Sequence, residues 1–297
     1  MQKILLLLCL FTATPLAAQL LEYGFVSPSD YKTFDGKTIG KSSIQYISGN
    51  YQMPLYVKRD NPKGRSLLTA TISGKYARLH NEGEAKKGNP KEIINTGAML
   101  TYVTSIAERW NLIATAGASL NTTPHYIRLQ NIALTGGAIF TYSINKNLNI
   151  GIGAIATTAY GEPVVLPTPF INWKYEGKYS IELNMRGLPE FILSAQLNDK
   201  NRIILSPLAV EHFSAVINID GDNKLYSQNI LKTTIGVIHR INHRLILSAE
   251  AGFTSYRRAR IQERSYKAFW DDLFDSDKRH KFSPSGTISV ALKYSIR

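Results

Sequence analysis

Hydrophobic and polar residues alternate with a period of two through most of the chain. The alternation is clearest in 148–157, where apolar residues and small or polar residues take turns: Leu148, Ile150 and Ile152 against Asn149, Gly151 and Gly153. The segment 132–144 alternates in the same way, and Asn145-Lys146-Asn147 forms a tight polar turn between the two. A period of two with a short turn predicts an antiparallel hairpin that has one apolar face.

The same pattern recurs along the chain. The strands we expect are 20–26, 43–57, 67–77, 96–106, 110–121, 132–144, 148–157, 168–176, 178–186, 191–197, 202–219, 230–241, 245–261 and 287–297. Tight turns and longer loops join them alternately, and Pro54 requires a bulge, an edge or a strand end. We therefore expect an all-β fold, an antiparallel up-and-down transmembrane barrel of about fourteen strands, with twelve as the alternative count.

The distribution of aromatic residues favours a membrane barrel over a soluble sandwich. In a soluble sandwich the polar faces of the strands would simply be solvated. Here aromatic side chains gather within a few residues of the tight turns or the C-terminus, as in the aromatic girdle at a membrane interface. The expected girdle residues are Trp110, Phe140, Tyr142, Trp173, Tyr175, Tyr179 and Tyr294. Leu148, Ile150, Ile152 and Phe140 should then face lipid.

The first residues of the chain are typical of a secretory signal. Lys3 is followed by an apolar core at Ile4–Phe11 and by Leu16-Ala17-Ala18 before Gln19. We expect residues 1–18 to be a cleaved signal peptide and residues 19–297 to form the barrel domain in the outer membrane of a Gram-negative bacterium. The single cysteine, Cys9, lies inside the signal, so disulfides do not hold the mature domain together.

The short-turn segments of the chain are similar to one another and to a known class of proteins. They are IAERWNL, INKNLNI, YEGKYSI, LNDKNRI and INHRLIL, and a YGEPVVLP loop accompanies them. The chain resembles outer-membrane β-barrels of Gram-negative bacteria, and these motifs resemble a poorly characterised family that carries a domain-of-unknown-function label. The resemblance implies a membrane barrel and no particular activity.

The formal charge of +13 points to anionic partners. Because the chain is exported, we expect outer-membrane lipid and lipopolysaccharide rather than nucleic acid, and the barrel-assembly machinery during insertion. Charged residues on the less apolar strand faces should line the lumen: Glu182, Arg186, Lys232, Arg240, Glu250, Arg258, Arg260 and Lys293. They either line water, with the cationic excess favouring anions, or form a salt-bridged plug of structural value only.

Catalytic and metal-binding chemistry find little support in the sequence. The six histidines show no ligand spacing, and Glu211 and His212 fall on opposite strand faces although Ser214 is near. Four aspartates in the charged 265–281 loop lack the glycine-bearing spacing of a calcium loop, and a solvated or lipopolysaccharide-facing loop fits them better. We therefore expect no enzyme, no cofactor and no metal.

Three functions remain open for a monomeric barrel with both termini in the periplasm. The leading hypothesis is a channel or transporter for small solutes, with anions favoured by the excess of Arg and Lys. The second is a structural or accessory barrel with a closed lumen that acts through its loops in a surface complex. The weakest is a lipid-modifying enzyme at the rim, which would lose lipid hydrolysis on His212→Ala.

The barrel interpretation predicts heat-modifiable migration on a gel. Membrane-extracted protein should run faster unheated than boiled, because a closed barrel resists detergent denaturation. A protein that stays soluble without detergent, and migrates alike before and after boiling, would contradict the interpretation.

Overall fold

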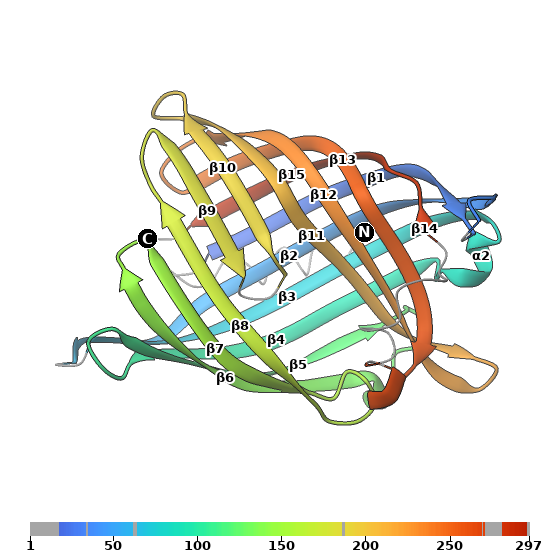
Figure 1. Cartoon of the computed structure of the whole chain (residues 1–297), viewed down its shortest axis with the longest axis horizontal. Coiled ribbons are helices and arrows are strands. Elements are labelled where there is room, and N and C mark those ends of the chain that lie inside the picture. The colour runs from blue at the N-terminus through green and yellow to red at the C-terminus, as the bar shows by residue number, and fades with distance from the viewer. Residues whose placement is uncertain are drawn as a thin grey trace, which may run out of the picture.

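The alternating segments pair into one antiparallel sheet that closes on itself (Figure 1). The computed structural model describes residues 18–33, 35–61, 64–185, 188–268, 270 and 281–295. Each long strand pairs with the next in sequence, and β1 (Ala18–Lys32) pairs with β15 (Ser285–Ser295) to complete a closed barrel of fourteen long strands. The expected fold class is confirmed.

The strands between β1 and β15 follow the order of the sequence. They are β2 (Thr38–Asn61), β3 (Gly64–Gly83), β4 (Glu92–Ser105), β5 (Trp110–Thr122), β6 (Ile132–Asn145), β7 (Leu148–Thr157), β8 (Val164–Tyr175), β9 (Tyr179–Met185), β10 (Glu190–Gln196), β11 (Asn201–Ile219), β12 (Asp222–Arg240) and β13 (Leu245–Glu263). The short elements of the described part of the chain include α2 (Ala85–Gly88), η1 (Leu129–Asn131) and β14 (Lys281–Phe282), which pairs with β1. Among the described residues, no helix is long and apolar enough to span a membrane.

The two ends of the barrel differ. Tight turns lie at the end where β1 begins and β15 finishes, and we call this the tight-turn end. The loops that follow β1, β3, β5 and β7 lie at the opposite, long-loop end. The β11–β12 hairpin also reaches the long-loop end, where Asp220 (φ 52°) and Gly221 (φ 94°) form its turn. Two positive φ angles match the twist of the paired strands, and β12 accordingly begins at Asp222, earlier than the alternation suggested.

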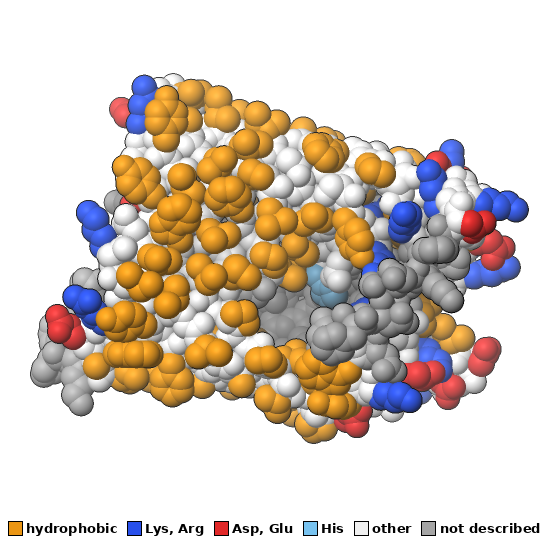
Figure 2. Space-filling model, in the orientation of Figure 1, with side chains coloured by type: hydrophobic (Ala, Val, Ile, Leu, Met, Phe, Trp, Pro, Cys, Tyr) orange, Lys and Arg blue, Asp and Glu red, His pale blue; other side chains and the backbone are white. Residues whose placement is uncertain are grey.

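The outer surface of the barrel is apolar. Ile152 is 70% exposed, and Phe140 and Ile150 are also exposed, so the face expected to contact lipid is confirmed. Figure 2 shows hydrophobic side chains spread over the visible wall, whereas Lys, Arg, Asp and Glu side chains gather toward the two ends. A continuous apolar exterior is unfavourable in water and suits a bilayer.

Bulges change which residues face the lumen, and those in β2, β11 and β13 bear on the site. The β2–β3 register shifts between Pro54 and Tyr56, as the proline requires. The β11–β12 register shifts between Ser206 and Ala209, and the β12–β13 register shifts where Leu231 pairs with Tyr256 and Lys232 with Thr254. One extra residue reverses the faces of every residue beyond it.

The hairpin of β9 and β10 is much shorter than its neighbours. Each of the two strands has seven residues, against 12 in β8 and 19 in β11. The pairing of β8 with β9 ends at Ile171, and the pairing of β10 with β11 ends at Ala209. Figure 1 shows the hairpin ending partway along the barrel, with the wall open between β8 and β11 toward the long-loop end.

The exposed apolar face predicts a position-dependent cost of charge. Ile152→Lys should lower the free energy of unfolding in lipid vesicles by ~2–4 kcal/mol, because the cation enters the hydrocarbon layer. Asn172→Lys, which places the same side chain on the lumen face of β8, serves as the control and should change it by less than ~1 kcal/mol. Urea titrations followed by tryptophan fluorescence measure both; equal effects would contradict the assignment of faces.

Candidate functional site: the lumen crossed by strand β11

Beyond its bulge, β11 leaves the wall and crosses the lumen. Val216 forms a parallel bridge with Thr122 of β5, on the opposite side of the barrel. Side chains of β3, β4 and β5 donate to three carbonyls on the edge that β10 no longer covers: Lys75 Nζ to His212 O at 3.4 Å, Asn95 Nδ2 to Ser214 O at 2.6 Å and Thr122 Oγ1 to Val216 O at 3.3 Å. These contacts replace part of the ladder that β11 has lost.

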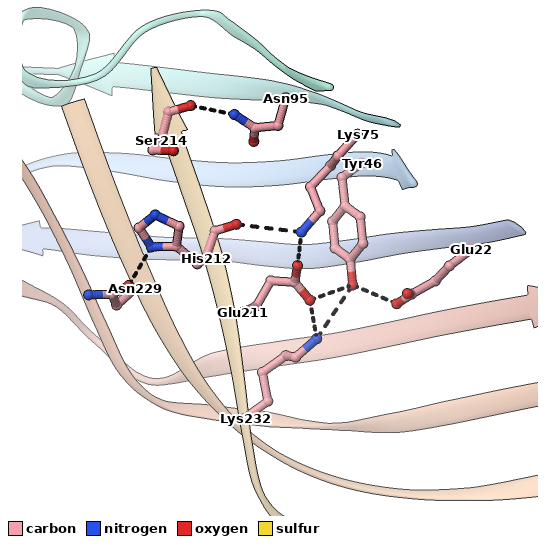
Figure 3. Close-up of polar contacts among 9 residues, drawn as sticks. All are labelled: Glu22, Tyr46, Lys75, Asn95, Glu211, His212, Ser214, Asn229 and Lys232. Carbon is pink, nitrogen blue, oxygen red and sulfur yellow. Dashed lines mark hydrogen bonds and ion pairs between the residues drawn. The ribbon is translucent and has the colours of Figure 1, made fainter. Parts of the chain in front are cut away.

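A cluster of charged and phenolic groups sits where β11 meets the opposite wall (Figure 3). Glu211 of β11 forms ion pairs with Lys75 of β3 and, at 3.0 Å, with Lys232 of β12. The Tyr46 hydroxyl donates to Glu22 at 2.9 Å and lies 3.4 Å from both Glu211 Oε2 and Lys232 Nζ. We call Glu22, Tyr46, Lys75, Glu211 and Lys232 the Glu211 cluster.

The Glu211 cluster combines two cations with two carboxylates. The Lys75 ammonium also lies 4.8 Å from the centre of the Phe213 ring, a cation–π distance. The side chains of Lys75, Glu211 and Lys232 are 22%, 15% and 11% exposed. Partial burial makes each charge depend on its partners, so the cluster holds β11 on β2 and β3.

One side of the crossing strand is packed as a protein core. Phe213, Ala215, Tyr226 and Ile230 contact inward residues of β1–β4, among which Val26, Ile44 and Ile93 are fully buried. Arg257 of β13 is 1% exposed within this layer. Its guanidinium donates to the carbonyl and hydroxyl of Ser42 at 2.8 and 2.9 Å and stacks 4.0 Å from the centre of the Phe282 ring.

The lumen is hollow nearer the tight-turn end. A cavity of about 430 Å³ is lined by residues of β8–β13, including Lys174, Glu182, Ser194, Arg202 and Glu250. At its rim, in the β8–β9 turn, a hydrogen bond from Lys174 holds the pKa of Glu176 below its usual value. Two cations and three carboxylates line the cavity, so its described lining does not favour anions.

The structure places the eight charged residues named from the sequence in different surroundings. Glu182 and Glu250 line the cavity, and Lys232 belongs to the Glu211 cluster. Arg240 and Lys293 are exposed near the tight-turn end. Arg186 lies outside the described residues.

The expectation that Arg258 and Arg260 share the lumen face of Glu250 is wrong. The β12–β13 register skips Ser255, so the inward positions pass from Thr254 to Arg257. Arg258 and Arg260 therefore lie on the other face of β13, where Arg260 Nε donates to the Ser227 hydroxyl at 2.9 Å.

The expected girdle residues all lie near the tight-turn end. Trp110, Phe140, Trp173, Tyr175 and Tyr179 are exposed, while Tyr142 and Tyr294 are partly exposed. The Trp110 and Tyr142 rings, paired across β5 and β6, lie 5.0 Å apart. Their placement fits the expected interfacial belt.

The candidate catalytic residues weighed from the sequence do not come together in the structure. Glu211 and His212 point to opposite faces of β11, and His212 Nδ1 lies 2.6 Å from Asn229 Oδ1 (Figure 3). Among the described residues, no three His, Cys, Asp or Glu side chains approach closely enough to hold a metal ion. The four aspartates of the 265–281 loop lie outside the described residues.

Four residues of the site were not identified as site residues from the sequence: Glu22, Tyr46, Lys75 and Arg257. Lys75 and Glu211 are 136 positions apart, and nothing local signals that they meet. Arg257 sits in a Tyr-Arg-Arg-Ala-Arg run, where the parity of the bulge decides which arginine turns inward.

The Glu211 cluster predicts a pattern of stability changes. Glu211→Leu should lower the free energy of unfolding by roughly 3 kcal/mol, because it removes the carboxylate that pairs with both partly buried ammonium groups. The triple variant Lys75→Met, Glu211→Leu, Lys232→Met should recover most of that loss, since apolar groups then fill the site. Urea unfolding in vesicles measures both, and a triple variant weaker than the single one would refute the pairing.

The chain has relatives in sequence and in fold. A search of curated proteins returns no match. Among solved structures, it is similar to the COG4313 outer membrane channel from Pseudomonas putida F1 (TM-score 0.42, 8% identity, 95% of this chain and 96% of that one) and to the NanC porin (TM-score 0.37, 7% identity, 93% and 99%). These likenesses concern the barrel alone. The model of a domain of unknown function, DUF6268, matches residues 14–295, and the chain therefore belongs to the DUF6268 family.

Proposed function

We propose that the protein is an outer-membrane channel for small solutes and that β11 closes its straight path through the lumen in this conformation. The observation that carries the proposal is the change in the lumen along its axis. The cavity of about 430 Å³ near the tight-turn end gives way to the crossing strand and the Glu211 cluster. Loss of the Glu211 ion pairs would weaken the attachment of β11 to the opposite wall and so favour its release.

The proposed channel lies in the outer membrane, with its tight turns and both termini in the periplasm after removal of a signal peptide. The apolar exterior and the aromatic belt at the tight-turn end support this orientation. The cavity lining carries both cations and carboxylates, so it favours neither anionic nor cationic solutes.

A second function, a closed accessory barrel, is favoured by the packed layer between β11–β13 and β1–β4. Its buried Phe213, Tyr226 and Ile230 resemble the core of a soluble protein. Such a barrel would have no conducting state, which separates it from a channel.

Conductance across a planar bilayer tests the channel. Wild-type protein should show rare, brief current steps. Glu211→Gln should raise the open probability at least about tenfold, which corresponds to ~1.4 kcal/mol of lost closed-state stability. The control Glu263→Gln removes a carboxylate from an exposed ion pair with Lys224 near the β11–β12 turn and should leave the open probability unchanged.

Absence of current steps in wild type and Glu211→Gln, with both proteins folded by gel migration, would refute the channel and favour the accessory barrel. Equal open probability in the two proteins would refute the role of Glu211 in closure.

A further inference from the structure

The opening in the wall lies between two strand edges that have lost their partners. On β8, residues 164–170 pair with β7 on one side only, because β9 ends opposite Ile171. On β11, pairing with β10 ends at Ala209, ten residues before the strand does. In the described part of the chain, no strand bridges these two edges.

The edge of β8 carries two prolines where a partner strand would need donors. The Lys174 amide donates to Asn147 O beside β7, and the β7–β8 register has no shift. Backbone amides alternate between the two sides of a strand, so Pro167 and Pro169 occupy positions whose amides would point away from β7. Proline has no N–H and blocks strand addition there. The open edge is therefore built into the sequence.

The opening lies at the height of the membrane. Leu166 pairs with Ile155, and the adjacent Val165 is 60% exposed on the outer surface. Leu134 of β6, near the same height, is 59% exposed. Because the surrounding wall is lipid-facing, the opening faces hydrocarbon in the half of the bilayer nearer the long-loop end.

Polar side chains stand across the opening from apolar ones. On β8, Val164, Leu166 and Phe170 have the inward parity. On β11, His212 lies on the face opposite Glu211 and is joined to Asn229 of β12. Arg258 and Arg260 of β13 pair with Asn229 and Ser227 and therefore lie on the same face. These polar and cationic side chains are costly against lipid and suit a polar group of a ligand. Figure 2 shows a hollow in the apolar wall.

We infer that the gap between β8 and β11 is a side portal through which a small, mainly apolar molecule with a hydrogen-bonding group exchanges between the lumen and the outer leaflet. The inference rests on the proposed channel function and deepens it by naming the solute class and its route. His212 and Asn229 recognise the polar group, and Leu166 and Phe170 contact the apolar part. Because β11 crosses the lumen and packs against β1–β4, the remaining path for a solute runs along the His212 face of β11.

Lipid access to an inward-facing residue tests the portal directly. Leu166→Cys carries a bimane label in vesicles that contain phospholipid with a nitroxide on its acyl chain. The nitroxide should quench bimane fluorescence at Leu166→Cys at least half as strongly as it quenches bimane at Val165→Cys, which faces lipid. Ile139→Cys, inward on the fully paired β6, should show under a fifth. Thr168→Cys, on the same face of β8, replaces Leu166→Cys if that variant fails to fold.

Uptake of N-phenyl-1-naphthylamine, an apolar fluorescent amine, by cells that express the protein tests the solute class. Wild type should raise the uptake rate several-fold over cells without it. Thr168→Arg, which places a cation in the gap, should remove that gain, and Thr38→Arg at the exposed rim should keep it.

The outcomes separate the portal from the channel. Quenching at Leu166→Cys or Thr168→Cys as low as at Ile139→Cys, or uptake unaffected by Thr168→Arg, overturns the portal even where Glu211→Gln conducts. Absence of current steps from both wild type and Glu211→Gln overturns the channel function itself, whatever the quenching shows.

Discussion

The backbone groups on one edge of β11 are the constraint on which the rest of the molecule depends. A barrel in lipid must pair every amide and carbonyl, and a closed ladder normally does so. Here β10 ends opposite Ala209, and β11 continues for ten more residues. An edge left in the wall would face hydrocarbon unpaired. Turning β11 into the lumen brings three of its carbonyls to Lys75, Asn95 and Thr122 instead.

Several features of the lumen follow from that turn. One face of β11 meets β1–β4 and completes a packed layer around Phe213, while Glu211 meets two lysines that would otherwise be unpaired in the lumen. The other face turns His212 toward the space that the strand has vacated. Closure of the straight path and opening of the wall are thus two consequences of one short hairpin.

Alternation along the chain was sufficient to predict the architecture. The strand count, the lipid-facing side of Phe140 and Ile152, and the tight turns all follow from a period of two, because a strand with one face in lipid tolerates little slippage. The same rule failed at Arg258 and Arg260, because a single extra residue at Ser255 exchanges the faces and no local signal marks it.

Contacts across the lumen could not be predicted, because they depend on where β11 ends up in space. Glu211 and Lys75 come from strands on opposite walls. One signal of the open edge was readable: Pro169 lies within the expected strand 168–176 and Pro167 directly precedes that strand, and paired strands avoid proline.

Cross-linking of Val216→Cys to Thr122→Cys tests the central claim most directly. These residues form a bridge in the structure, although their strands belong to opposite walls, and Cys9 is the sole other cysteine of the sequence. Oxidation, or a short bifunctional thiol reagent, should join them in high yield in protein that is folded in vesicles, since paired strands bring Cα atoms to about 5 Å. If folded protein shows no cross-link while adjacent wall partners such as Trp110→Cys and Tyr142→Cys do, β11 does not cross the lumen.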